Sequence, residues 1–267
     1  MRGASFPASF PVVRSALALT LFTAALFGCA NAQTPDEAAS AGAASAADAE
    51  PVVIADGRVA SEWTDVSDWS TRAPLPEAFA AARAHWQAQD PGYEEEVRVM
   101  AVADGAFTEP GSAQQAVLYL MSLWPRCCPK MGIAVIEDGA LVRNVAFEVP
   151  AQDLAVVPDL DGDGRDELAV TGSFGMGGEN TTSVTLVSLA DSGLRTWGGT
   201  MIQYDACAAM QEGGTAVRIT AVPGPEFTIE RFALASCETG EYQPGGPPEP
   251  FEFPAPGEET SVELPVE

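Results

Sequence analysis

Residues 159–168 read Asp-Leu-Asp-Gly-Asp-Gly-Arg-Asp-Glu-Leu, the most distinctive stretch of the 267-residue sequence. Calcium is a hard cation that binds six to eight oxygen ligands, and carboxylates at loop positions 1, 3 and 5 can surround it. Asp159, Asp161 and Asp163 have this spacing, and Gly164 at the sixth position permits the sharp turn that such a loop makes. The stretch therefore predicts a calcium loop. The alternative is an Asp- and Gly-rich turn that only links two strands.

The segments on either side of this loop have the pattern of strands. Residues 154–157 and 168–170 are apolar and rich in valine, whereas an EF-hand has a helix on each side and a bidentate Glu at position 12, where this chain has Val170. Position 7 offers the backbone carbonyl of Arg165, with the side chain directed away, and the acid at position 9 is Glu167. The loop is thus expected to lie between two strands.

This combination of acidic loop and following strand resembles the FG-GAP/VCBS repeats of integrin-α-type propellers and many bacterial surface proteins. The resemblance implies one structural calcium ion, with ligands from Asp159, Asp161, Asp163, the Arg165 carbonyl and Glu167. The family usually has Asp at the ninth position, so Glu167 lengthens one ligand arm.

Alternating apolar residues predict strands through most of the chain beyond residue 97. Residues 117–121 form a buried-strand run, and residues 132–136 and 140–145 flank an Asp-Gly pair that is typical of a β-hairpin. An Ala-rich stretch at 75–90, with a proline near its start, predicts one helix before these strands.

The order of turn and strand is repeated. Residues 104–111 (Asp-Gly-Ala-Phe-Thr-Glu-Pro-Gly) lead into a strand and then a hairpin, as residues 159–164 do, but they lack the acids for a metal. Residues 212–214 suggest a third, shorter copy. We therefore expect a mainly β protein of blade-like antiparallel β-meander repeats, either partly or small propeller-like or a β-sandwich, with one N-terminal helix near 75–90.

The first 28 residues have the pattern of an export signal. They contain Arg2 and Arg14, no acid, and an apolar core at 16–27 that is shorter than the roughly 20 residues of a spanning helix. The signal ends in Leu26-Phe27-Gly28-Cys29, which resembles the bacterial lipobox. That resemblance implies lipidation of Cys29 and attachment to the cell envelope, with the outer membrane favoured. The alternative is an ordinary signal peptide cut after Ala30-Asn31-Ala32.

Composition then divides the remaining chain. Residues 29–50 are Ala, Ser and acidic residues that cannot form a core, so we expect a disordered tether. A β-rich domain is expected at 51–239 and a Pro/Glu-rich tail at 240–267, in which 250–253 allow a short edge strand. The net charge of −25 argues against nucleic acid and anionic lipid surfaces as partners and favours divalent cations or basic partners. The expected partners are the membrane, through the N-terminal lipid, and an envelope protein or a glycan.

The other four cysteines suit an oxidising compartment. Neighbouring cysteines rarely bridge each other, so Cys127 and Cys128 are expected to pair one each with Cys207 and Cys237. A zinc site is disfavoured because the single histidine, His85, lies in the predicted helix. A vicinal redox pair at Cys127-Cys128 remains as an alternative.

The sequence does not carry a recognisable catalytic constellation. It has no Gly-x-Ser-x-Gly, no His-Glu-x-x-His and no second histidine. A non-catalytic binding or structural role is therefore favoured. The alternatives are a small periplasmic or surface hydrolase that uses acidic residues, and a thiol redox protein. A hydrolase requires a concave pocket with convergent, pKa-shifted acids.

Overall fold

The alternation of side chains along β3 (Gln114–Ser122) determines how the layers of the fold are stacked. Successive side chains of a strand point to opposite faces of the sheet, and β3 is buried on both faces. Ala116, Leu118 and Leu120 belong to a core cluster shared with β6 (Asp153–Val157) and β7 (Glu167–Met176). Val117, Tyr119 and Met121 belong to a second cluster, which is shared with the helix α1 (Leu75–Gln89).

The structure is a computed structural model, and it describes residues 50–59, 66, 68–90, 92–93, 95–123, 129–190, 193–209, 213–254 and 261–266. These residues fall within one compact unit that runs from residue 44 to residue 267. The predicted signal, the lipobox with Cys29 and nearly all of the predicted tether lie outside the described residues. Among the described helices, none combines the length and the apolar character needed to cross a membrane.

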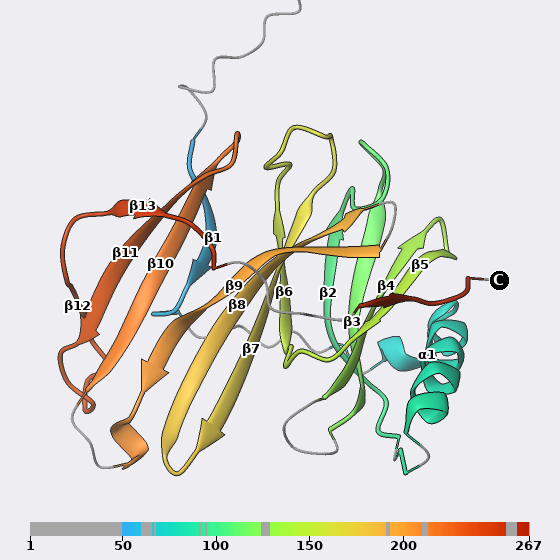
Figure 1. The fold of residues 1–267 in the computed structure, drawn as a ribbon, viewed down its shortest axis with the longest axis horizontal. Coiled ribbons are helices and arrows are strands. Elements are labelled where there is room, and N and C mark those ends of the chain that lie inside the picture. Colours follow the sequence, from blue (N-terminus) through green and yellow to red (C-terminus); the bar gives the residue numbers. More distant parts are fainter. Residues whose placement is uncertain are drawn as a thin grey trace, which may run out of the picture. The chain divides into compact units, whose positions relative to one another are not determined.

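The first sheet has five antiparallel strands in the order β14-β5-β4-β3-β2 (Figure 1). Its remaining strands are β2 (Arg98–Gly105), β4 (Lys130–Glu137), β5 (Ala140–Phe147) and β14 (Val262–Glu263). The predicted hairpin is confirmed, since Asp138 and Gly139 join β4 to β5 with φ values of 50° and 79°. This positive-φ pair is what the Asp-Gly dipeptide predicts.

The second sheet has nine strands, with β12-β11-β10-β9-β8-β7-β6 in order, β1 paired with β10, and β13 with β11. The strands not yet given are β1 (Val52–Asp56), β8 (Glu179–Ala190), β9 (Gly193–Asp205), β10 (Gly214–Val222), β11 (Glu226–Leu234), β12 (Tyr242–Pro244) and β13 (Glu249–Phe251). Two 3₁₀ turns complete the described elements, η2 (Trp69–Thr71) and η3 (Cys207–Ala209).

The two sheets each contain an antiparallel four-strand meander, β2–β5 in one and β6–β9 in the other. The turn at 104–111 joins β2 to β3, and the turn that carries 159–164 joins β6 to β7. The predicted mainly β fold of blade-like meanders with one N-terminal helix is confirmed. The suggested third copy at 212–214 stays a prediction: Gly214 begins β10, which forms a hairpin with β11, and both strands belong to the same sheet as β6–β9.

Cys207 forms a disulfide with Cys237, so the predicted pairing of these two with Cys127 and Cys128 is wrong. The reason is topological. The β10–β11 hairpin returns the chain to the end of β9, and this brings the Cα atoms of Cys207 and Cys237 to 5.5 Å, within the usual range for a disulfide. Cys127 and Cys128 lie outside the described residues.

The tail is more regular than its composition indicates. Tyr242–Pro244 and Glu249–Phe251 both pair with β11, so the short edge strand allowed near 250–253 is present, and a further strand precedes it. Val262–Glu263 pairs with β5 of the other sheet. Long-range partners impose these strands on a sequence whose own propensity is low.

A buried hydrogen-bond pair attaches α1 to the first sheet. The Tyr119 hydroxyl donates to Asn144 Oδ1 at 2.6 Å, and Asn144 Nδ2 donates to the Ala78 carbonyl at 2.9 Å. Tyr119 and Asn144 are both fully buried, so neither polar group has water as an alternative partner.

We predict that Tyr119→Phe lowers the free energy of unfolding by about 1–3 kcal/mol, because it leaves the buried Asn144 oxygen without its donor. Urea unfolding followed by circular dichroism measures this change. The matched control is Tyr93→Phe, which removes a half-buried hydroxyl that donates to the Met121 carbonyl at 3.1 Å. If Tyr119→Phe lowers the free energy of unfolding no more than Tyr93→Phe does, this contradicts the stabilising role given to the Tyr119–Asn144 hydrogen bond.

Candidate metal centre

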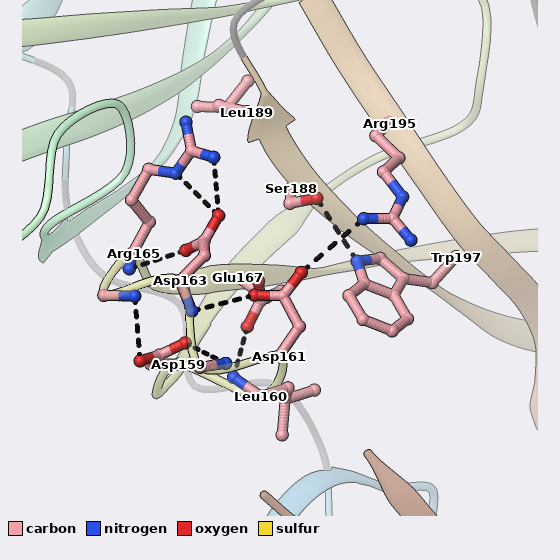
Figure 2. A network of polar contacts seen from close by, with 12 residues as sticks. Asp159, Leu160, Asp161, Asp163, Arg165, Glu167, Ser188, Leu189, Arg195 and Trp197 are labelled. Carbon is pink, nitrogen blue, oxygen red and sulfur yellow. Dashed lines mark hydrogen bonds and ion pairs between the residues drawn. The ribbon is translucent and has the colours of Figure 1, made fainter. Parts of the chain in front are cut away.

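Three carboxylates converge in the turn between β6 and β7. One ligand oxygen each from Asp159, Asp161 and Asp163 lies within 4.8 Å of the others. Figure 2 shows these side chains gathered over the turn. The structure therefore brings together the three Asp residues that the sequence predicts as ligands, and it places them between two strands, as predicted.

Backbone N–H groups and two glycines give the turn its shape. Asp159 accepts from the N–H of Gly162 at 2.8 Å and of Gly164 at 3.0 Å, one on each carboxylate oxygen. Asp161 Oδ1 accepts from the N–H of Asp163 at 3.3 Å. Gly162 and Gly164 have φ values of 78° and 86°, a region that costs other residues steric strain.

Two guanidinium groups lie against the acids. Arg165 donates from Nε to Asp163 Oδ2 at 2.9 Å and from its own backbone N–H to Oδ1 at 2.9 Å. These hydrogen bonds hold the pKa of Asp163 below its usual value. The Arg165 side chain thus folds back over the loop, whereas we expected it to point away. Arg195 from β9 reaches the same cluster, with Nη1 3.6 Å from Asp161 Oδ2.

Glu167, the predicted fifth ligand, is the first residue of β7 and is 1% exposed. Its Oε2 accepts from the Leu160 N–H at 2.8 Å. Burial and, to a smaller extent, the negative charges of the three Asp residues together raise its pKa to about 7. Glu167 is therefore electrostatically coupled to the cluster, although the group of three converging oxygens does not include it.

Asp166 is a residue that the sequence analysis missed. Its Oδ2 accepts from the Ala106 N–H at 2.8 Å, and its own N–H donates to the Ala106 carbonyl at 2.7 Å. A Cβ on Gly164 would lie 2.8 Å from Pro110. Asp166 thus fastens the acidic loop to the turn that follows β2, in the other sheet. The repeat of turns was visible in the sequence, but nothing there indicates that the two turns touch.

The dimensions and chemistry of the cluster fit calcium. Calcium–oxygen distances are about 2.3–2.6 Å, so two ligands on opposite sides of an ion lie roughly 4.6–5.2 Å apart. The three Asp oxygens all lie within 4.8 Å of one another, close enough to contact one such ion. All side-chain donors in the predicted set are carboxylate oxygens, which hard cations prefer.

A cavity of about 710 Å³ has two acids, Asp56 and Asp153, in its lining. A hydrogen bond from Arg58 lowers the pKa of Asp56. Glu167, the acid with a raised pKa, does not line this cavity.

Comparison with known proteins gives one family match, which covers the acidic loop and its neighbouring strands. Residues 151–187 match the family model of the FG-GAP repeat. The match spans β6, the acidic loop, β7 and most of β8, and it confirms the FG-GAP resemblance for this part of the chain. No curated protein and no solved structure gives a significant match.

We predict that the metal-free protein loses stability as the pH rises from about 4.5 to about 7. Over this range the native state keeps a proton on Glu167, whose pKa is about 7 rather than 4.5, while the unfolded chain releases it. The contribution of this proton to the free energy of unfolding is fully present below pH 4.5 and is lost above pH 7. It amounts to roughly 3 kcal/mol, because each pKa unit corresponds to about 1.4 kcal/mol.

Urea unfolding in EDTA at several pH values tests this prediction. Glu167→Gln should flatten the pH dependence, because the amide keeps the shape of the side chain and does not titrate. The exposed Glu226→Gln is the control and should keep the wild-type slope. An unchanged slope in Glu167→Gln would show that another group is responsible.

Proposed function

We propose that this chain is a lipid-anchored protein of the cell envelope whose β domain is stabilised by one structural calcium ion and has a binding or structural role rather than a catalytic one. The observation that carries the proposal is the convergence of Asp159, Asp161 and Asp163 inside a segment that matches the FG-GAP repeat. Asp159, Asp161, Asp163, the Arg165 carbonyl and Glu167 are the proposed ligands.

The electrostatics of the loop explain why an ion would stabilise the fold. Carboxylates held this close together repel one another, and Glu167 is buried beneath them at a cost that raises its pKa. A divalent cation reverses this repulsion and favours the ionised form of Glu167. Since Asp166 ties the loop to Ala106, the stabilisation would extend to both sheets.

The proposed location depends on Cys29 and on charge. The lipobox-like Leu26-Phe27-Gly28-Cys29 supplies an anchor, and two or three acyl chains are enough to hold a protein on a bilayer. The net charge of −25 would keep the domain off anionic lipid and attract cationic ligands. The outer membrane is the favoured site, as the residue after Cys29 is Ala30.

We predict that calcium raises the thermal midpoint of the full chain by roughly 5–10 °C. A ligand at a hundred times its Kd adds about 2.7 kcal/mol of stability, and each kcal/mol shifts the midpoint of a domain of this size by about 2–4 °C. Differential scanning fluorimetry in EDTA and in millimolar calcium measures the shift.

Asp161→Asn should abolish most of this shift, because one ligand charge is lost without a change in shape. The matched control is Asp104→Asn, at the first position of the acid-poor turn. Its exposed carboxylate accepts a hydrogen bond from half-buried Gln115 at 2.9 Å, and it should keep the full calcium shift. Equal midpoints in EDTA and calcium for the wild-type chain would refute the structural calcium.

We predict that Cys29→Ser moves the protein from the membrane fraction to the soluble fraction and prevents incorporation of labelled palmitate. The serine hydroxyl is not the thiol to which the lipid would be attached. Fractionation of cells that produce either form provides the measurement. Labelled palmitate in the Cys29→Ser protein would argue against this anchor, and so would an unlabelled wild-type chain.

A further inference from the structure

We propose that a groove beside the metal loop binds an organic cation, that is, an alkylated or quaternary ammonium group on an apolar body. This groove, which we call the aromatic groove, has a volume of about 600 Å³. Its main lining residues are Trp197, Glu226, Phe227, Phe251, Glu252 and Phe253. The proposal names a ligand class for the binding role proposed above, and it does not depend on calcium.

The aromatic groove is built from three segments of the second sheet. Trp197 comes from β9, Phe227 from β11, and Phe251 from β13, where it is paired with Phe227. The ring of Phe253 lies edge-to-face with both, with centroids 5.0 Å from Phe227 and 5.0 Å from Phe251. The rings of Phe227, Phe251 and Phe253 thus form one continuous wall, to which the strand pairing gives a fixed shape.

Gly198 permits this arrangement. A Cβ at position 198 would lie 2.7 Å from the Phe253 Cβ and 2.4 Å from the Pro254 carbonyl oxygen. Its φ of 145° is also unfavourable for other residues. The close crossing of residues 253–254 over β9, next to Trp197, therefore requires glycine.

The groove offers acceptors and ring faces but almost no donors. Two of its lining residues, Pro225 and Pro250, have no N–H. The Trp197 Nε1–H is already donated to Ser188 Oγ at 3.3 Å, and the Thr228 hydroxyl is engaged with that of Thr220 at 2.6 Å. Among the described residues that line the groove, none is basic. The lining therefore offers an anion no charged side chain to pair with.

A cation, by contrast, has several favourable partners in the aromatic groove. Aromatic faces attract cations, most strongly ammonium groups with apolar substituents that can also pack on the rings. The exposed Glu226 and Glu252 supply negative charge at the groove. The neighbouring Arg195 already illustrates this interaction, with its guanidinium 4.6 Å from the centre of the Trp197 ring. Figure 2 shows the Arg195 guanidinium beside the Trp197 ring and joined to Asp161 by an ion pair.

The volume of the aromatic groove indicates the size of the ligand. Pockets for small molecules are about 300–1,000 Å³, and the aromatic groove falls within that range. A bare metal ion would leave the aromatic wall unused, whereas an ammonium group with an apolar body uses both the rings and the carboxylates. The net charge of the chain would raise the local concentration of such a ligand.

Choline and its neutral isostere 3,3-dimethylbutan-1-ol test the proposal directly, because they differ in charge and scarcely in shape. Calorimetric titration of the full chain in EDTA and in calcium should show choline binding at least about tenfold more tightly than the isostere. The double variant Glu226→Gln/Glu252→Gln should weaken choline binding about three- to tenfold. Phe253→Leu, which keeps apolar volume and removes a ring, should weaken it as well.

The control is Glu238→Gln/Glu241→Gln, which changes the net charge equally at exposed positions before β12. If this control weakens choline binding as much as Glu226→Gln/Glu252→Gln does, choline is attracted to the acidic surface in general, and the proposal is overturned. Equal affinity for choline and the isostere, or no binding of choline, would also overturn it. If choline binding fails in this way while calcium still raises the thermal midpoint, only the organic-cation proposal is overturned, and the proposed structural calcium ion stands.

Discussion

Three carboxylates held on one short turn repel one another, and the residues around them offset this repulsion only in part. Asp159, Asp161 and Asp163 can share this space only if positive charge or N–H groups offset their charges. In the structure, backbone N–H groups and the guanidiniums of Arg165 and Arg195 do so in part. Burial and, to a smaller extent, the charges of the three Asp residues raise the pKa of Glu167 to about 7, so unfavourable electrostatic energy remains. A divalent cation is the simplest group that removes it.

The same turn is a joint between the two sheets. Asp166 exchanges two hydrogen bonds with Ala106, and the core cluster beneath contains residues of both meanders. The turns at 104–111 and 159–164 occupy equivalent places in their meanders. One of them keeps the acids, and the other supplies backbone groups and Pro110 to hold it. On the opposite side, Arg195 connects the acidic loop to Trp197 and so to the aromatic groove.

Features that depend on nearby residues could be predicted from the sequence. The acidic loop, its flanking strands, the Asp-Gly hairpin and the helix near 75–90 all have local signals, and each is present. The pairing of Cys207 with Cys237 could not be predicted, because it depends on how the β10–β11 hairpin returns the chain. Asp166 and the tail strands β12 and β14 were missed for a similar reason, since their partners lie far away in the sequence.

The most direct test is equilibrium dialysis of the full chain against calcium-45, with Asp161→Asn in parallel. The account predicts that each wild-type chain retains a single tightly held ion and that the variant loses most of this binding. Wild-type protein that retains no more label than the variant would contradict it, because the gathered carboxylates would then be an acidic turn held by hydrogen bonds and arginine alone.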